Sequence, residues 1–134
     1  MKSALAFLLI CLLALPTLAA EAGSLSQPTG ERHFPDVIHV SVTGAGDGLF
    51  NFDVTVSSPY DTPARYADGF RVSSPSGEVL GVRKLWHDHQ GEQPFTRDLY
   101  GVRIPPTVKA VIVQARDQKF GYGGKSMRVT LPGR

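Results

Sequence analysis

His87 and His89 are the residues of this chain whose type and spacing most directly offer metal chemistry. They lie in the stretch KLWHDHQGEQPFTRDLYGV, residues 84–102. In an extended segment, side chains two positions apart point the same way, so both imidazoles can reach one ion. Neutral imidazole suits zinc, copper and nickel. Because two ligands alone bind a metal weakly, such a site requires a further ligand from elsewhere in the chain.

The further ligands of this hypothetical zinc or copper site must come from residues that the fold brings to the two histidines. The candidates are Asp117, Glu92 and His33. His39 is a poorer candidate, because it lies further along the first expected strand and faces away from the core-facing Ile38 and Val40. The competing interpretation is a solvated loop whose histidines cap strand ends or bond to the backbone. H-x-H is a short motif, so both interpretations stay open.

A second group of residues favours recognition of another exported protein, by the loops or by a sheet edge. It comprises Tyr66, Asp68, Arg97, Phe120 and Tyr122. Phe120 and Tyr122 stand among glycines in DQKFGYGG, residues 117–124, and rigid rings on a glycine-rich loop resemble an antibody paratope. Arg97 could bind a carboxylate through two parallel hydrogen bonds. In this hypothesis, Phe120, Tyr122 and Arg97 are the anchors.

Each of these residues also has a purely structural interpretation. Arg97 could form a salt bridge with Asp117 or Asp68 that pins two loops together. The two aromatic rings could fold back on the domain, and Asp68 could bond its own backbone in the turn before Gly69. Phe95, in the segment EQPFTR, is expected to pack beneath its loop.

The sequence carries few signs of an enzyme. It has neither the G-x-S-x-G turn used in acyl transfer nor the H-E-x-x-H helix of metallohydrolases. No serine stands in a recognisable nucleophile setting. Asp88 and Glu92 could do acid–base work, but any exposed loop would show such a pair. We therefore assign no catalytic residue and expect a binding module.

Short runs with period-two alternation, separated by glycine and proline, must position these loops. In LFNFDVTVSS, Phe50, Phe52, Val54 and Val56 alternate with mostly polar residues. The pattern predicts an all-β fold: an antiparallel β-sandwich of about seven strands, immunoglobulin-like or fibronectin-like, with a small barrel as the alternative. The domain is expected at residues 36–132. The expected strands cover residues 36–43, 49–58, 69–74, 78–86, 97–104, 108–116 and 125–131.

Simple up-and-down ordering of these strands sorts their connections into two poles. One pole receives the tight turns at residues 44–48, 75–77 and 105–107. The other, which we call the loop pole, comprises residues 59–68, 87–96 and 117–124. The chain enters its first strand at the loop pole, so His33 and Phe34 are expected nearby. Long loops gathered at one end of a rigid sandwich are the usual place for function.

The first residues have the composition of an export signal. Lys2 is followed by an apolar run over residues 4–15, then by Pro16 and small residues. This pattern predicts a signal peptide at residues 1–20, with an uncleaved N-terminal anchor as the alternative. The apolar run is too short for a membrane helix, so no membrane span is expected after cleavage.

The mature chain is accordingly expected to be periplasmic or secreted. Cleavage fits after Ala19, Ala20 or Ala22, and the polar residues 21–35 are expected to form a flexible lead-in. Cys11, the only cysteine, lies inside the signal, which excludes disulfides and thiolate ligands from the mature chain. After removal of the signal's single lysine, 13 basic and 12 acidic side chains remain, a net charge of about +1. This scattered charge argues against nucleic acid as a partner.

Several segments together resemble a family of short exported bacterial proteins. They are YADGF (66–70), HDH (87–89), EQPFTRDLYGV (92–102), ARD (115–117) and GYGG (121–124). Members of that family carry Y-A-D-G-[WF], H-x-H, E-Q-P-F-T-R and A-R-D…G-x-G-G segments, of which E-Q-P-F-T-R is the specific one. The resemblance spans most of residues 36–132, although Asp98 replaces an expected Ser and Phe70 a common Trp. The family has no assigned activity, so the resemblance implies export and no particular reaction.

Overall fold

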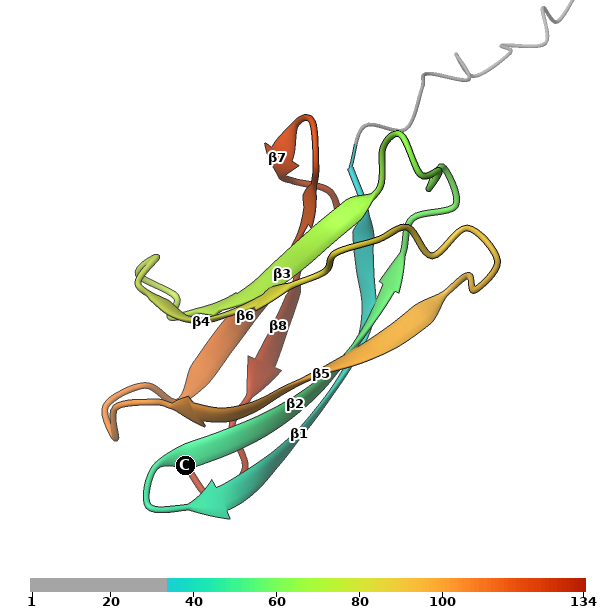
Figure 1. Cartoon of the computed structure of the whole chain (residues 1–134). Coiled ribbons are helices and arrows are strands. Elements are labelled where there is room, and N and C mark those ends of the chain that lie inside the picture. The colour runs from blue at the N-terminus through green and yellow to red at the C-terminus, as the bar shows by residue number, and fades with distance from the viewer. Residues whose placement is uncertain (1–33) are drawn as a thin grey trace, which may run out of the picture.

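The computed structural model describes residues 34–134, which contain strands, turns and bends but no helix (Figure 1). The predicted signal peptide, most of the predicted lead-in and the candidate ligand His33 lie outside the described residues. In the described part, accordingly, no helix is long and apolar enough to cross a membrane.

Eight strands follow one another along the described residues. They are β1 (Asp36–Gly46), β2 (Leu49–Ser57), β3 (Ala67–Ser73), β4 (Val79–Lys84), β5 (Phe95–Arg103), β6 (Ala110–Asp117), β7 (Gly121–Tyr122) and β8 (Met127–Thr130). Seven of them correspond to the expected strands. The additional strand, β7, consists of two residues and forms inside the predicted loop 117–124 by pairing with the end of β6.

The strands form two antiparallel sheets, which confirms the predicted all-β antiparallel sandwich. One sheet has the order β1-β2-β5. The other has the order β4-β3-β6, with β7 and β8 both pairing to β6. Because the sheets are separate, the small closed barrel is not the fold. The immunoglobulin-like or fibronectin-like topology stays a prediction.

The core lies between the two sheets and follows the period-two alternation of the sequence. Phe52, Val54 and Val56 of β2 are fully buried, and Phe70 and Val72 of β3 face them from the other sheet. Side chains at alternate positions of a strand point to one face, so each strand contributes every second residue to this layer.

The first strand departs from the predicted pattern. A register shift against β2 falls between Val37 and His39, so Val37 is buried and Ile38 is 45% exposed. The prediction that Ile38 faces the core is therefore wrong. A bulge inserts one residue and reverses the alternation on one side of it, which a strict period-two pattern cannot anticipate. Val40, beyond the bulge, packs against the core as expected.

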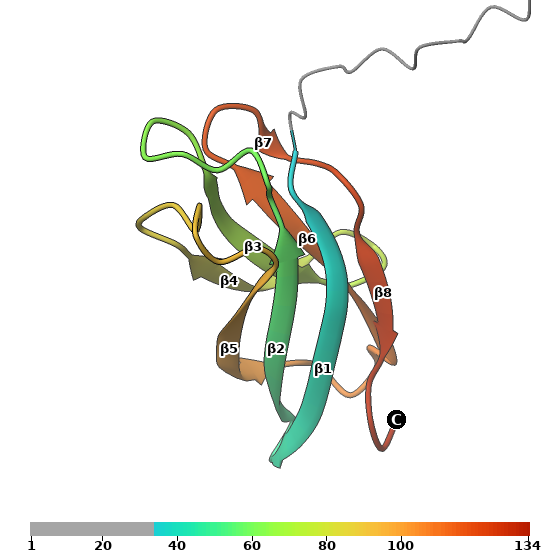
Figure 2. The same cartoon turned by 90° about the vertical axis from the view of Figure 1, so that its right-hand side faces the viewer.

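The three long connections gather at one end of the sandwich, as the ordering argument predicts (Figures 1 and 2). Hydrogen bonds join them directly. The Tyr60 hydroxyl donates to Asp117, the His89 backbone N–H donates to Asp61, and the Gln118 N–H donates to a backbone carbonyl of the first loop. Phe34 also lies at this end, where its ring meets the Phe120 ring edge-on at 6.2 Å.

Candidate functional site

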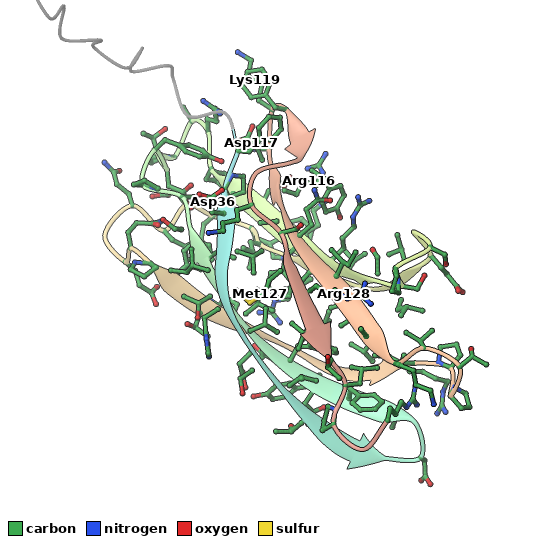
Figure 3. The ribbon with its side chains drawn as sticks, turned by 180° about the vertical axis from the view of Figure 1, so that it is seen from behind. Asp36, Arg116, Asp117, Lys119, Met127 and Arg128 are labelled. Atoms are coloured by element: carbon green, nitrogen blue, oxygen red, sulfur yellow. The ribbon has the colours of Figure 1, made fainter. Side chains whose placement is uncertain are left out.

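Asp117 is the central acceptor of the loop pole. It is the last residue of β6, falls in the inward phase of that strand, and is 0% exposed (Figure 3). One carboxylate oxygen accepts a hydrogen bond from the Tyr60 hydroxyl at 2.7 Å. The other accepts the backbone N–H groups of Lys119 and Phe120, each at 2.8 Å. The Arg65 guanidinium lies 3.3 Å away. A carboxylate offers about four lone-pair sites, so these donors occupy it fully.

The electrostatics of Asp117 agree with this assignment. Burial raises the pKa of the Asp117 carboxyl, but hydrogen bonds from Tyr60, the two backbone N–H groups and Arg65 outweigh burial and hold this pKa below its usual range. Burial and the same hydrogen bond raise the pKa of Tyr60 above its ordinary value. The carboxylate is therefore ionised and the phenol neutral at neutral pH. Asp117 acts as a structural acceptor that holds two loops together.

Asp61 plays the same role between the first and second loops of the pole. Its buried carboxylate accepts the Ala67 N–H at 3.0 Å through one oxygen and the His89 N–H at 3.0 Å through the other. Sequence reasoning missed this residue. The available signal was its setting in PYDTPARYAD, since aspartate in a turn commonly accepts backbone N–H groups.

The structure brings the two histidines of the H-x-H segment side by side but in different environments. Their ring centroids are 4.9 Å apart. The His89 side chain is 2% exposed and stacks on Phe95 with a centroid separation of 3.9 Å. Phe95 itself is buried beneath the loop, as predicted. The His87 ring is exposed, and its Nδ1 donates to the carbonyl of Asp88 at 2.8 Å.

The remaining candidate ligand, Glu92, is bound by Arg97. Two parallel hydrogen bonds of 3.2 and 2.9 Å join the guanidinium to the carboxylate, and this contact lowers the pKa of Glu92. The predicted partners of Arg97, Asp117 and Asp68, are wrong. Arg97 lies five positions from Glu92 and is partly exposed. Asp117 is buried at the end of β6, which belongs to the other sheet.

The predicted zinc or copper ligands are thus not assembled by the described residues. Within residues 34–134, no group of three His, Cys, Asp or Glu side chains could hold a metal ion. Asp117 and Glu92 are engaged by donors of the chain itself. The two histidines remain a pair without a third ligand in this part of the chain.

We expect that Zn²⁺ or Cu²⁺ at a few equivalents leaves the melting temperature unchanged. A ligand raises the melting temperature only when it binds the native state, and two imidazoles alone bind weakly. Thermal unfolding followed by circular dichroism tests this expectation. A saturable rise in the wild type that disappears in a His87→Ala/His89→Ala variant would contradict it.

We also expect the free energy of unfolding to decrease as the pH falls below about 6.5, the ordinary value for histidine. Burial lowers the pKa of His89 most, and the charge of Arg97 lowers it further. The nearby carboxylate of Asp61 opposes both effects. The unfolded chain therefore takes up a proton before the native state does. The decrease can reach about 1.4 kcal/mol per pH unit until the native His89 titrates as well.

Urea unfolding at a series of pH values tests this dependence. A His89→Phe variant is the control, because phenylalanine keeps a ring against Phe95 and removes the titrating group. The variant should lose most of the slope between about pH 6.5 and about pH 5. An equal slope in both proteins would show that another group is responsible. Asp117 cannot supply this slope, because its lowered pKa places its effect below the ordinary aspartate value.

Trp86 is the most exposed large apolar side chain among the described residues and is separated from the end of β4 only by Leu85. It is 75% exposed. Two neighbours contact this residue: the Tyr66 hydroxyl donates to its backbone carbonyl at 3.2 Å, and the Lys84 ammonium lies 4.8 Å from its ring. Sequence reasoning did not nominate Trp86. Its signal was the alternation along β4, in which Trp86 follows Val82 and Lys84 at intervals of two residues.

A continuous surface surrounds this tryptophan. We call it the Trp86 surface, and it comprises Val82, Lys84, Trp86, His87 and Arg97. A depression of about 90 Å³ lies at its loop end, and a second of about 190 Å³ lies on the adjoining face of the sheet. Both depressions are lined by Arg83 and Lys84, so they adjoin at the end of β4.

The structure distributes the five residues predicted for partner binding over different neighbourhoods. Tyr66 and Arg97 lie beside the Trp86 surface or in it. Asp68 pairs with Arg116 on the outer face of the sheet. The Tyr122 ring is covered by the Arg71 guanidinium at 3.9 Å. Phe120 lies apart from these residues, against Phe34 and beneath Arg65. The predicted anchors Phe120, Tyr122 and Arg97 do not form one patch.

Comparison with known proteins gives one similarity. The chain is 36% identical over 94 residues to a protein of Halomicrobium mukohataei described as "Putative lipoprotein". The match covers 70% of this chain and 46% of that protein, so the chain spans about half the length of the relative it matches. No protein-family model and no solved structure matches the chain. The description of that relative names no activity.

Proposed function

We propose that this chain is an exported binding module that recognises another exported protein through the Trp86 surface. The signal-like N-terminal residues support export, and so does the relative's description as a lipoprotein. The protein would then act in the cell envelope or outside the cell, in the periplasm or as a secreted protein.

The observation that carries the proposal is the exposure of Trp86 on a segment whose backbone is held. Tryptophan is well buried on average, and it is enriched among the residues that dominate the binding energy of protein interfaces. Here the residue is 75% exposed, while the Tyr66 hydroxyl bonds its backbone carbonyl and the Lys84 ammonium lies 4.8 Å from its ring. A backbone that is already held loses less conformational entropy when a partner covers it, so more of the contact energy appears as affinity.

The loop pole supports this role as a scaffold. Asp61 accepts two backbone N–H groups and Asp117 accepts backbone and side-chain donors, so both carboxylates hold the loops in place. Residues that present a binding side chain work best when packing and hydrogen bonds lock them. The second loop of the pole, which follows Trp86, is held by Asp61 through His89.

Affinity capture with matched variants tests the proposal. The immobilised chain should retain a polypeptide from an extract of exported proteins, and Trp86→Ala should weaken its retention by about tenfold or more. Tyr100→Ala is the control, since Tyr100 is 56% exposed on β5 of the other sheet. The control should retain the polypeptide as the wild type does. Equal retention by all three proteins would contradict the proposal, provided that circular dichroism shows the variants folded.

A further inference from the structure

A row of paired residues crosses the outer face of the larger sheet beside the Trp86 surface. Lys84 of β4 pairs with Gly69 of β3, Gly69 pairs with Arg116 of β6, and Arg116 pairs with Tyr122 of β7. Residues directly opposite each other on neighbouring strands point to the same face. Figure 3 shows Arg116 near the β7 end of β6.

A depression lies over Gly69 in the middle of this row. A Cβ atom at Gly69 would lie 2.5 Å from the backbone oxygen of Arg83, so a larger residue does not fit without a shift of the backbone. Neighbouring strands are about 4.8 Å apart, which places the Cα atoms of Lys84 and Arg116 about 10 Å from each other across the glycine. The depression has a volume of about 190 Å³, and we call it the Gly69 pocket. It is lined by Asp68, Gly69, Val82, Arg83, Lys84, Arg116 and Tyr122.

The Gly69 pocket carries an excess of positive charge. Its lining has three cationic side chains and one carboxylate, which gives 3 − 1 = +2. The carboxylate of Asp68 is already bound to Arg116. Arg83 lies 3.6 Å from Asp98 on β5. Lys84 is different, because no carboxylate pairs with it among residues 34–134 and its ammonium is engaged only by the Trp86 ring.

A further cation borders the pocket from the next row. Arg71 pairs across β3 with Val82 on one side and Gln114 on the other, so it points to the same outer face. Its guanidinium stacks on the Tyr122 ring at 3.9 Å and donates to the Gln114 side chain at 2.9 Å. No carboxylate pairs with Arg71 in the described part of the chain. Arg71 and Lys84 thus leave two positive charges uncompensated around one small hollow.

We propose that the Gly69 pocket binds an acidic side chain of the partner protein, with the carboxylate held between Lys84 and Arg116 beside the Tyr122 ring. The inference rests on the proposed function, since it names the chemistry of the segment that the Trp86 surface recognises. Charge complementarity favours an acidic occupant, because charge-assisted hydrogen bonds from Lys and Arg to a carboxylate are stronger than neutral ones. Lys84 belongs to both sites, so one extended segment can cover Trp86 and place an acidic residue over Gly69.

A titration with a defined probe tests the inference without knowledge of the partner. The exported chain is titrated to millimolar concentration with a glutamate-rich peptide, with the same peptide carrying glutamine throughout, and with inorganic phosphate. Amide NMR shifts report on Gly69 and its neighbours, and fluorescence reports on Trp86, the only tryptophan of the chain. The glutamate peptide should shift the amides of Gly69, Lys84 and Arg116, and the glutamine peptide should not.

Two variants separate the pocket from general attraction to a basic face. Lys84→Gln should weaken binding of the glutamate peptide by about tenfold, which is the effect of one lost charge-assisted hydrogen bond. Arg128→Gln is the matched control, because Arg128 pairs with Ile112 on the same outer face but lies outside the pocket. The Arg128→Gln variant should bind the glutamate peptide with an affinity within about twofold of the wild-type value, as expected for a screened surface charge. Equal losses in both variants would overturn the inference.

The remaining outcomes are also decisive. Absence of shifts at Gly69 with the glutamate peptide overturns the inference, and so does equal binding of the glutamine peptide. Phosphate binding as strong as that of the peptide would show a site for small free anions, which also overturns it. If Trp86→Ala abolishes partner capture while Lys84→Gln retains it fully, the proposed function stands and the pocket assignment fails. If the glutamate peptide binds at Gly69 but capture does not depend on Trp86, the proposed function fails alone.

Discussion

Replacing Asp117 with alanine should lower the free energy of unfolding by about 3–5 kcal/mol, the range for removal of one partner from a buried ion pair. The substitution leaves the Tyr60 hydroxyl and the N–H groups of Lys119 and Phe120 without their acceptor. It also leaves the partly buried Arg65 charge without its carboxylate. Urea unfolding of the chain measures the change. Because a domain is stable by only about 5–15 kcal/mol, this loss is a large fraction of the total stability.

Two substitutions make this prediction specific. Asp117→Asn keeps one acceptor oxygen and should cost less, about 1–3 kcal/mol. Asp53→Ala removes an aspartate that points outward from β2 and accepts only from the exposed Tyr100 hydroxyl at 3.0 Å. It should cost about 0.5 kcal/mol or less, as is usual for surface positions. If Asp117→Ala lowers the free energy of unfolding no more than Asp53→Ala does, the loop pole does not depend on its buried carboxylate.

Asp61→Ala should be the next most damaging change, at about 2–4 kcal/mol for two buried hydrogen bonds left without an acceptor. The backbone N–H groups of Ala67 and His89 would lose the Asp61 carboxylate as their acceptor in a buried region. Because Asp61 joins the first and second loops of the pole, amide hydrogen exchange should accelerate at Ala67 and His89 together. Urea unfolding and amide exchange measure the two effects.

Asp88→Ala is the control for that prediction. Asp88 lies in the second loop beside His89, and its carboxylate accepts the Gln90 N–H at 3.2 Å in an exposed setting. Water can replace a lost acceptor there, so the cost should stay below about 1 kcal/mol. If amide exchange at His89 is unchanged in Asp61→Ala, the proposed link between the two loops is wrong.

The sandwich could be predicted because alternation dominates its central strands. Phe52, Val54 and Val56 of β2 occupy the buried phase that the sequence indicates. The gathering of the long loops followed from the antiparallel order alone. The buried side of β1 could not be predicted fully, because the bulge at Val37 and His39 changes the phase without any signal in the pattern.

The candidate site was harder to predict, because residue type suggests chemistry while burial and partners decide it. Asp117 was selected as a metal ligand for its carboxylate, yet it shares the inward phase of β6 with Val113 and Ala115. A buried carboxylate must find donors, and the backbone supplies them at this loop. Trp86 was overlooked because an apolar residue at a strand end is usually assumed to belong to the core, whereas the alternation along β4 places it outside.

Photo-cross-linking from the Trp86 surface tests the central claim most directly. Two variants are expressed in the cells that make the protein. One carries a photoreactive amino acid in place of the exposed Val82, and the other carries it in place of Tyr100 on the other sheet. We predict an adduct with one other polypeptide from position 82, its loss when Trp86→Ala is added, and no adduct from position 100. An adduct from position 100 alone, or one from position 82 that persists undiminished in the Trp86→Ala background, would contradict the account.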